Sequence, residues 1–352
     1  MTKIVSLKTV AHEAGVSIAT ASRVLGKSSH PVNSETASNV LKVAERLGYS
    51  PNALARAIVT KHSGLIGVLV GDNSDPYFAT ITHGIHTVAH QHGSLVMVCN
   101  TLRDPQTELD YLAILDSYHA EGILLVGGML TYPGHQEKMT SIIERYIKNG
   151  GFVVTLTDHP SCSAAVTVDN YQASFDMAIF LTHLGHRRIG YLRGPANLST
   201  SEKRERGFVD AMQAAGIPHR SISIVDGSFS VDMATQAMQE LMSQPRPPTA
   251  VFTANDLNAI GCHIAASNIG LKVPEDVSIV GMDNIEPARY MIPPLTTVDI
   301  PMMELGKQAA ARLFSLIEGK PVPPLTVLRH ELVIRGSTAP PNQPLIPKYG
   351  RK

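Results

Sequence analysis

A chain of 352 residues with a hydrophobic share of 43% is too long for one small core and too apolar for a disordered segment. Its 30 basic and 30 acidic residues cancel to a net charge of zero, but they are unevenly distributed. Residues 1–62 carry eight basic and three acidic side chains, a local charge of +5, which leaves −5 for the remainder. A basic N-terminal segment on a mildly acidic body indicates a polyanionic partner.

The cysteines and the N-terminus indicate the compartment. Cys99, Cys162 and Cys262 are odd in number and widely spaced, so neither a disulfide framework nor a zinc ribbon is expected. The N-terminus lacks the charged-then-apolar pattern of a signal peptide, and no apolar stretch approaches the roughly 18 residues that span a bilayer. We therefore expect a protein of the reducing cytoplasm with no membrane partner.

Residues 10–25, VAHEAGVSIATASRVL, predict a helix-turn-helix. Apolar residues repeat at helical spacing on both sides of Gly15, and Ser17 is a typical N-cap for the second helix. A third helix is expected between a cap at Asn33 and a stop at Gly48. Three short helices predict an all-α DNA-binding domain over residues 1–49. The alternative is a small solvated helical domain with no nucleic-acid partner.

The second of these helices carries the residues that would read DNA. Ile18 and Ala19, at its start, can touch thymine methyl groups but cannot hydrogen-bond to bases. Arg23, further along the same face, can make a bidentate contact with guanine O6 and N7. The residues better suited to phosphates, which set register rather than read sequence, are Ser17, Thr20 and Ser22.

Residues 50–62 are expected to link this domain to the rest of the chain. Within them, NALARAIVT at residues 52–60 has a helical composition but is too short to form a stable helix alone. It would become ordered only with a partner, and an ordinary flexible linker is the alternative.

From residue 65 onward the pattern changes to alternating strands and helices. Continuous apolar runs such as LIGVLV, GILLVGG and VSIVGMD suit strands buried on both faces of a parallel sheet. The alternation predicts an α/β body over residues 63–336 made of two doubly wound parallel-sheet lobes. We expect an N-lobe in about 63–162 and 291–321, and a C-lobe in about 163–290 and 322–336. Residues 337–352 are proline-rich and are expected to form a loose tail.

A small ligand is expected in the cleft between the lobes, at the carboxyl ends of the strands. The polar candidates that follow predicted strands are Asp72, Asp75, Asn100, Asp158, Arg204, Asn255 and Asp283. Most are carboxylates and amides, which suit a polyhydroxylated sugar, and an arginine adds a bidentate donor. Phe78 and Tyr77 would contact the face of the ligand's ring. The alternative for each carboxylate is a loop cap or a solvated charge.

Motifs over residues 7–336 resemble those of the lac repressor family of bacterial transcription regulators. The matching segments are KTVAHEAGVSIATASRVLG, YSPNALARAIV, TVDNYQAS, LGHRRIGYLRGP, KRERGF, VFTANDLNAIG, VPEDVSIVGMDN and PPLTTV. The resemblance implies a body of the periplasmic-binding-protein type and a homodimer that binds an inverted repeat, by default as a repressor. It also implies that Arg204, Asn255 and Asp283, followed by Asp158, contact the effector.

The resemblance gives residues 50–62 a role as hinge helices that enter the minor groove of DNA. The positions that match the family's hinge contacts are Asn52, Ala55 and Ile58. The wedge position is usually leucine, so the β-branched Ile58 is a departure, because its side chain is stiffer and differently shaped. Ala55 retains the small residue that lets two hinge helices approach.

Two other classes of function fit the sequence less well. No GxGxxG, P-loop or GxSxG motif occurs, so neither an enzyme nor a cofactor is expected. A periplasmic sugar-binding protein would need a signal peptide and would leave the N-terminal domain unexplained. His83, His86 and His90 share one helix face, but no fourth ligand is evident, so no metal site is expected.

Overall fold

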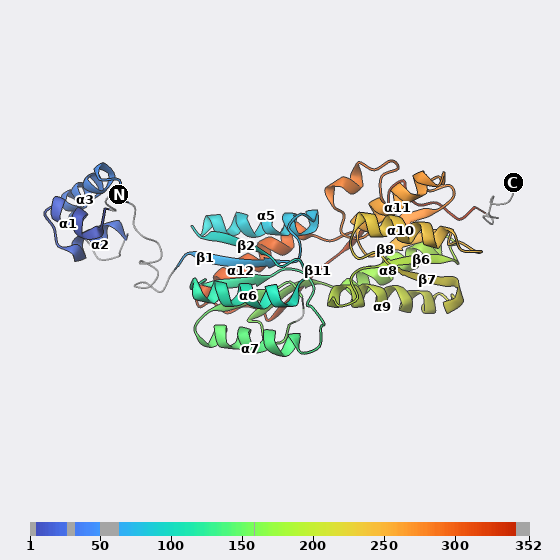
Figure 1. Cartoon of the computed structure of the whole chain (residues 1–352), viewed down its shortest axis with the longest axis horizontal. Helices are drawn as coiled ribbons and strands as arrows, with labels where there is room; N and C mark the ends of the chain where they lie inside the picture. The colour runs from blue at the N-terminus through green and yellow to red at the C-terminus, as the bar shows by residue number, and fades with distance from the viewer. Residues whose placement is uncertain (1–4, 27–31, 50–62, 158, 343–352) are drawn as a thin grey trace. The chain divides into compact units, whose positions relative to one another are not determined.

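The computed structural model describes residues 5–26, 32–49, 63–157 and 159–342. The chain divides into two compact units, Met1–Gly64 and Leu65–Lys352, each of which is described by itself (Figure 1). The predicted linker, with Asn52, Ala55 and Ile58, lies outside the described residues, as does Asp158.

In the first unit, the described residues 5–26 and 32–49 form three helices, as the sequence predicted. Its helices are α1 (Leu7–Glu13), α2 (Ile18–Leu25) and α3 (Ser34–Arg46). Ser17 caps α2 by accepting a hydrogen bond from the backbone N–H of Thr20 at 3.1 Å, and Asn33 caps α3 by accepting one from Glu35. The core is built from small and β-branched residues, namely Val10, Ala11, Ala14, Ala21, Val40, Val43 and Ala44. Such small side chains let short helices pack closely.

The second unit contains two parallel sheets. The N-lobe sheet has the strand order β11-β5-β4-β3-β1-β2, and the C-lobe sheet has the order β7-β6-β8-β9. The N-lobe strands are β1 (Leu65–Val70), β2 (Leu95–Asn100), β3 (Gly122–Leu125), β4 (Phe152–Thr155), β5 (Ala164–Val168) and β11 (Leu325–Leu328). The C-lobe strands are β6 (Ile189–Arg193), β7 (Ile222–Asp226), β8 (Ala250–Thr253) and β9 (Ser278–Val280). The predicted class, a helix-turn-helix domain with a two-lobed α/β body, is confirmed.

Helices cover both faces of each sheet (Figure 1). In the N-lobe they are α5 (Pro76–Gln91), α6 (Pro105–Ser117), α7 (His135–Lys148) and α12 (Met302–Ile317). In the C-lobe they are α8 (Asn170–His183), α9 (Ser199–Ala214), α10 (Val231–Met242) and α11 (Asp256–Asn268). Strand β1 shows why its apolar run is continuous: Ile66 and Val68 belong to the core under α5 and α12, whereas Leu65 and Leu69 belong to the core under α6 and α7.

Helices α5 and α12 pack closely because each carries a glycine at the contact. A Cβ atom on Gly84 would come within 2.4 Å of the carbonyl oxygen of Met303, and one on Gly306 within 2.1 Å of that of Ile81. Only glycine permits this approach of two backbones.

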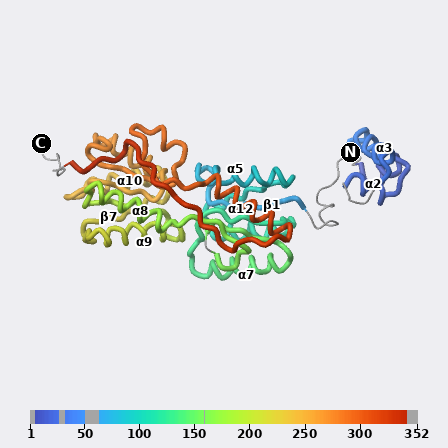
Figure 2. The backbone as a smooth tube through the Cα atoms, turned by 180° about the vertical axis from the view of Figure 1, so that it is seen from behind, coloured from blue at the N-terminus to red at the C-terminus, as the bar shows by residue number. Residues whose placement is uncertain are grey.

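The lobe boundaries differ from the prediction. Residues 163–168 and 322–328 were assigned to the C-lobe, but β5 and β11 pair with each other and β5 pairs with β4, so all three belong to the N-lobe sheet. The prediction was wrong here because no helix separates β4 from β5, which breaks the strand–helix alternation on which the boundary was drawn. The chain passes between the lobes after β5 and again near the antiparallel pair β10 (Thr297–Asp299) and β12 (Glu331–Val333) (Figure 2).

The predicted loose tail is wrong for its first residues. Ser337 is fully buried, donates a hydrogen bond to the carbonyl oxygen of Ile279 and accepts one from the backbone N–H of Thr296. Two residues later, the carbonyl oxygen of Ala339 accepts a hydrogen bond from the Nε2 of His186 at 3.0 Å. Residues 337–342 are therefore part of the C-lobe, and residues 343–352 lie outside the described part of the chain.

His186 makes the stability of the C-lobe depend on pH. Its side chain is 1% exposed, and burial lowers its pKa to about 4, so it is neutral in the folded protein. In the unfolded chain it takes up a proton below about pH 6.5, so stability is retained above that pH and is lost as the pH falls towards 4. We expect about 2 kcal/mol of unfolding free energy to be lost at pH 5. Thermal unfolding between pH 7.5 and 5 measures this.

The matched control for this prediction is the exposed His183 on α8. His186→Gln should reduce the pH dependence of the melting temperature without abolishing it, because burial also lowers the pKa of His263 in the same lobe to about 4. His183→Gln should leave the pH dependence unchanged. Equal pH dependence in the wild type and His186→Gln would contradict the assignment to His186.

Candidate functional site

The start of α2 presents an exposed face in the N-terminal domain. Ile18 is 50% exposed although it is apolar, and Ala19, Ser22 and Arg23 are exposed beside it. Ala21, between them, is fully buried in the domain core and fixes which face of the helix points outward. The side chains of Ser17 and Thr20 hydrogen-bond to each other, and that of Ser17 also caps α2. Both side chains therefore already have hydrogen-bond partners within the helix cap. The outward face is the arrangement expected of a DNA-reading helix.

A cavity lies between the two lobes at the carboxyl ends of their strands, where the sequence placed it. Both lobes contribute to its wall, which includes apolar side chains of β1, β3 and the loops after β3 and β6. Of the predicted effector residues, those that line it are Asp75, Phe78, Arg204, Asn255 and Asp283, together with Tyr77. Asp72 and Asn100 are not part of this wall. Asp72 instead accepts hydrogen bonds from the backbone and hydroxyl of Ser74.

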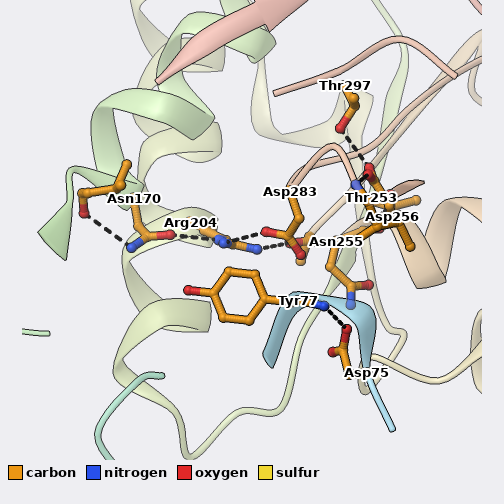
Figure 3. Close-up of polar contacts among 12 residues, drawn as sticks. Asp75, Tyr77, Asn170, Arg204, Thr253, Asn255, Asp256, Asp283 and Thr297 are labelled. Carbon is orange, nitrogen blue, oxygen red and sulfur yellow. Dashed lines mark hydrogen bonds and ion pairs between the residues drawn. The ribbon is translucent and has the colours of Figure 1, made fainter. Parts of the chain in front are cut away.

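Arg204 is the centre of the polar contacts in the cavity (Figure 3). It is 3% exposed, and its Nη2 donates to Asp283 Oδ1 at 2.9 Å. Its Nε donates to Asn170 Oδ1 at 2.9 Å, and its Nη1 donates to the carbonyl oxygen of Ala254. One guanidinium therefore connects the start of α8 with the loops that follow β8 and β9.

The carboxylates around Arg204 are held away from water. Burial raises the pKa of Asp283 to about 7 against the opposing effect of Arg204, and burial also raises the pKa of Asp75. Asp283 has a backbone φ of +114°, a conformation that costs energy for a residue other than glycine. Behind it, Asp256 is fully buried and accepts hydrogen bonds from Thr297 Oγ1 and the backbone N–H of Ile285. Perturbed carboxylates in a cavity are typical of binding sites.

Arg103 links aromatic residues of the two lobes. Its guanidinium carbon lies 5.6 Å from the ring centre of Phe78 in the N-lobe and 5.6 Å from that of Phe229 in the C-lobe. Such cation–π contacts are favourable when the cation is partly desolvated. The contact stabilises the arrangement in which the lobes are close together.

Several wall residues were not predicted from the sequence. They are Thr101, Arg103, Glu108, Thr155, Thr157, His159, Thr200 and Phe229. Thr101 follows β2 directly and Thr157 lies two residues beyond the end of β4, so the strand-end rule could have found both had it included hydroxyl side chains. Glu108 lies on α6 and Phe229 in a loop, and nothing in the local pattern places either at the cavity.

A metal centre finds no support among the described residues, in which no group of three or more His, Cys, Asp or Glu side chains could hold an ion. His83, His86 and His90 are exposed on α5. None of the helices described is long and apolar enough to cross a membrane.

Comparison with known proteins identifies the family. The model of the lacI family of bacterial regulatory proteins matches residues 6–52, and that of the periplasmic binding protein-like domain matches residues 178–338. The transcriptional repressor CytR of Escherichia coli K12 is 36% identical over 334 residues, which cover 95% of this chain and 96% of CytR. The chain belongs to the lacI family. It is a DNA-binding transcription regulator with a small-molecule-binding body, and the prediction that it is not an enzyme is confirmed.

Solved structures agree with this assignment. The lac repressor dimer bound to operator and the anti-inducer ONPF superposes with a TM-score of 0.84 at 27% identity, over 96% of this chain and all of that one. A lacI-family regulator from Enterococcus faecium with bound ribose has a TM-score of 0.70 at 28% identity, over 79% of this chain and all of that one.

The buried pair of Arg204 and Asp283 should be coupled in stability. Asp283→Asn leaves the charge of Arg204 buried and uncompensated, so the unfolding free energy should fall by about 3 kcal/mol or more. The double variant Arg204→Met, Asp283→Asn lacks both charges of the pair and should lose less than the sum of the two single losses. Urea denaturation of the four proteins measures the coupling, and strictly additive losses would contradict it.

Proposed function

We propose that this regulator is a repressor that binds an inverted-repeat operator as a homodimer and responds to a sugar bound between its lobes. The observation that carries the proposal is the cavity, in which buried carboxylate, amide and guanidinium groups surround apolar and aromatic side chains. Hydroxyl groups of a sugar can hydrogen-bond to the polar groups, and its ring face can pack on the apolar and aromatic side chains. We also propose that the protein acts in the cytoplasm, where the operator is accessible.

Relatives support the repressor role, the dimer on operator DNA and the sugar ligand. CytR is named a transcriptional repressor, the lac repressor was solved as a dimer on its operator, and the Enterococcus faecium regulator holds ribose. The ribose-bound regulator at 28% identity and the cellobiose complex of the regulator CelR at 26% identity support the class of ligand and not one particular sugar.

Strand β2 offers a surface for the second copy of the chain. It lies at an edge of the N-lobe sheet, and its Leu95 and Val98 are 69% and 38% exposed. Edge strands with exposed apolar side chains tend to associate, because their backbone groups are unpaired and their side chains are poorly solvated. We propose that this edge contributes to the dimer.

Arg23 is proposed to read a base. Arg23→Ala should weaken operator binding by about 1–3 kcal/mol and relax the preference at one base pair in each half-site, because a bidentate contact to guanine is lost. Selection of binding sites from random DNA, followed by anisotropy titrations at several salt concentrations, measures both effects.

Arg46 on α3 provides the matched control. It is an exposed arginine of the same domain, paired at 3.2 Å with Glu13. Arg46→Ala should leave the preferred sequence unchanged. If Arg23→Ala also keeps the wild-type preference at every position, Arg23 contacts phosphate rather than a base.

Asp75 is proposed to bind the effector. It caps α5 by accepting a hydrogen bond from the backbone N–H of Tyr77 at 2.9 Å, and asparagine can replace it in that role. Asp75→Asn should therefore retain the fold while it weakens sugar binding about tenfold to a hundredfold, because a charged acceptor is lost. Calorimetry with a panel of pentoses, hexoses and disaccharides measures the affinity.

Asp104→Asn is the control for this experiment. Asp104 caps α6 in the same way, by accepting from Thr107, and is not part of the cavity wall. This variant should bind the sugar as the wild type does, and neither variant should change operator affinity in the absence of sugar. Full sugar affinity in Asp75→Asn would remove Asp75 from the site.

A further inference from the structure

A second polar cluster lies on the N-lobe wall of the cavity. It consists of Glu108 from α6, His135 at the start of α7 and His159 from the loop after β4. Glu108 and His159 line the cavity, and His135 is 4% exposed behind them. The Nε2 of His135 donates a hydrogen bond to Glu108 Oε2 at 2.7 Å, which holds the carboxylate in place. None of these residues is in the Arg204 group described above.

The position of the proton on His159 follows from its contacts. Its Nδ1 accepts a hydrogen bond from the backbone N–H of Ser161 at 3.3 Å, so a neutral ring carries its proton on Nε2. Burial lowers the pKa of His159 and favours that neutral form. The ring is 8% exposed, and its Nε2 is buried with no hydrogen-bond partner in the described part of the chain. A buried donor without an acceptor is costly, and such groups often mark sites that a ligand completes.

The chemistry of the cluster selects among possible ligand groups. His159 offers a hydrogen-bond donor. Glu108, whose negative charge interacts with His159, can accept a further hydrogen bond in addition to the one from His135. A carboxylate or phosphate would accept from His159 but would be repelled by Glu108, and an ammonium group would suit Glu108 but not the His159 donor. A hydroxyl group can accept from His159 and donate to Glu108 at the same time.

We propose that His159 and Glu108 form a hydroxyl-binding subsite on the N-lobe wall of the effector cavity. This inference rests on the proposed function, because it requires a polyhydroxylated effector. It adds a second set of polar contacts opposite those of Asp283 and Asn255 in the C-lobe. An effector that uses both sets contacts both lobes and binds most tightly when they are close together.

The test compares sugars that differ by one hydroxyl group. Calorimetry first finds a sugar that binds the wild-type protein, and monodeoxy analogues of that sugar are then titrated into the wild type and His159→Phe. Phenylalanine keeps an aromatic ring and removes both the Nε2 donor and the Nδ1 acceptor of the Ser161 hydrogen bond. We expect His159→Phe to bind the parent sugar about tenfold more weakly than the wild type does. The deoxy analogue that lacks the hydroxyl group bound by His159 should bind the wild type weakly. Its affinity should not fall further in His159→Phe, because the contact with His159 is already absent.

Two further variants separate this role from a structural one. His159→Gln retains a side-chain N–H donor and should recover part of the affinity and of the hydroxyl discrimination. The exposed His183→Gln should behave as the wild type in every titration. A change in folding alone would weaken all analogues equally in His159→Phe.

The possible outcomes distinguish this inference from the proposed function. If a sugar binds the wild type and His159→Phe with equal affinity and the same preference among deoxy analogues, the subsite is wrong and the sugar-binding function stands. If no sugar of the panel binds the wild type, whereas it still binds operator DNA, both the sugar effector and the subsite are overturned.

Discussion

The buried charge of Arg204 is the constraint on which the C-lobe side of the cavity depends. A guanidinium that is 3% exposed must be compensated by internal partners, because its desolvation is otherwise prohibitive. Here the partners are Asp283, Asn170 and the carbonyl oxygen of Ala254, which lie in the loop after β9, at the start of α8 and in the loop after β8. Compensation of one charge thus fixes the relative positions of those three segments. Asp283 can keep a strained backbone conformation because this network holds it.

This network changes the role expected for Arg204. The sequence suggested an arginine that reaches out to the effector, but its Nε and one N–H from each terminal nitrogen are already used inside the protein. Removing its side chain would leave Asp283 buried without its ion-pair partner, so it would disturb the fold as well as ligand binding. Asp75 and Asn255 line the same cavity, and each side chain accepts a helix-capping hydrogen bond, from the backbone N–H of Tyr77 and of Asn258. Asparagine can keep the cap at Asp75, so the contact that Asp75 makes with a ligand is easier to separate from stability.

Sequence reasoning succeeded where the signal is local. Helix caps such as Ser17 and Asn33 depend on hydrogen bonds within a few residues, and the apolar run of β1 is continuous in the sequence. Both signals predicted the positions of their helices and strand correctly. It failed where the outcome depends on distant partners. Strand β11 joins the N-lobe only because β5 is available to pair with it, and Ser337 is buried only because the loop before β10 receives it.

The same distinction explains which site residues were found. Asp75 and Asp283 follow strands, and the carboxyl ends of parallel strands meet at one edge, so proximity could be inferred. His159 and Glu108 line the same cavity because α6 packs against the N-lobe sheet, and neither spacing nor residue type reveals that proximity.

A cavity with polar groups on both walls has a consequence for regulation. A ligand shifts a conformational equilibrium only to the extent that it binds the two states unequally. An effector held by one lobe alone would bind open and closed bodies with nearly the same affinity and would change little. In this chain Asp75 and Phe78 come from the N-lobe, and Asn255 and Asp283 from the C-lobe, so a ligand that contacts all four loses contacts when the lobes separate. Each lost contact adds to the difference in affinity, and that difference is the free energy by which the effector can alter DNA binding.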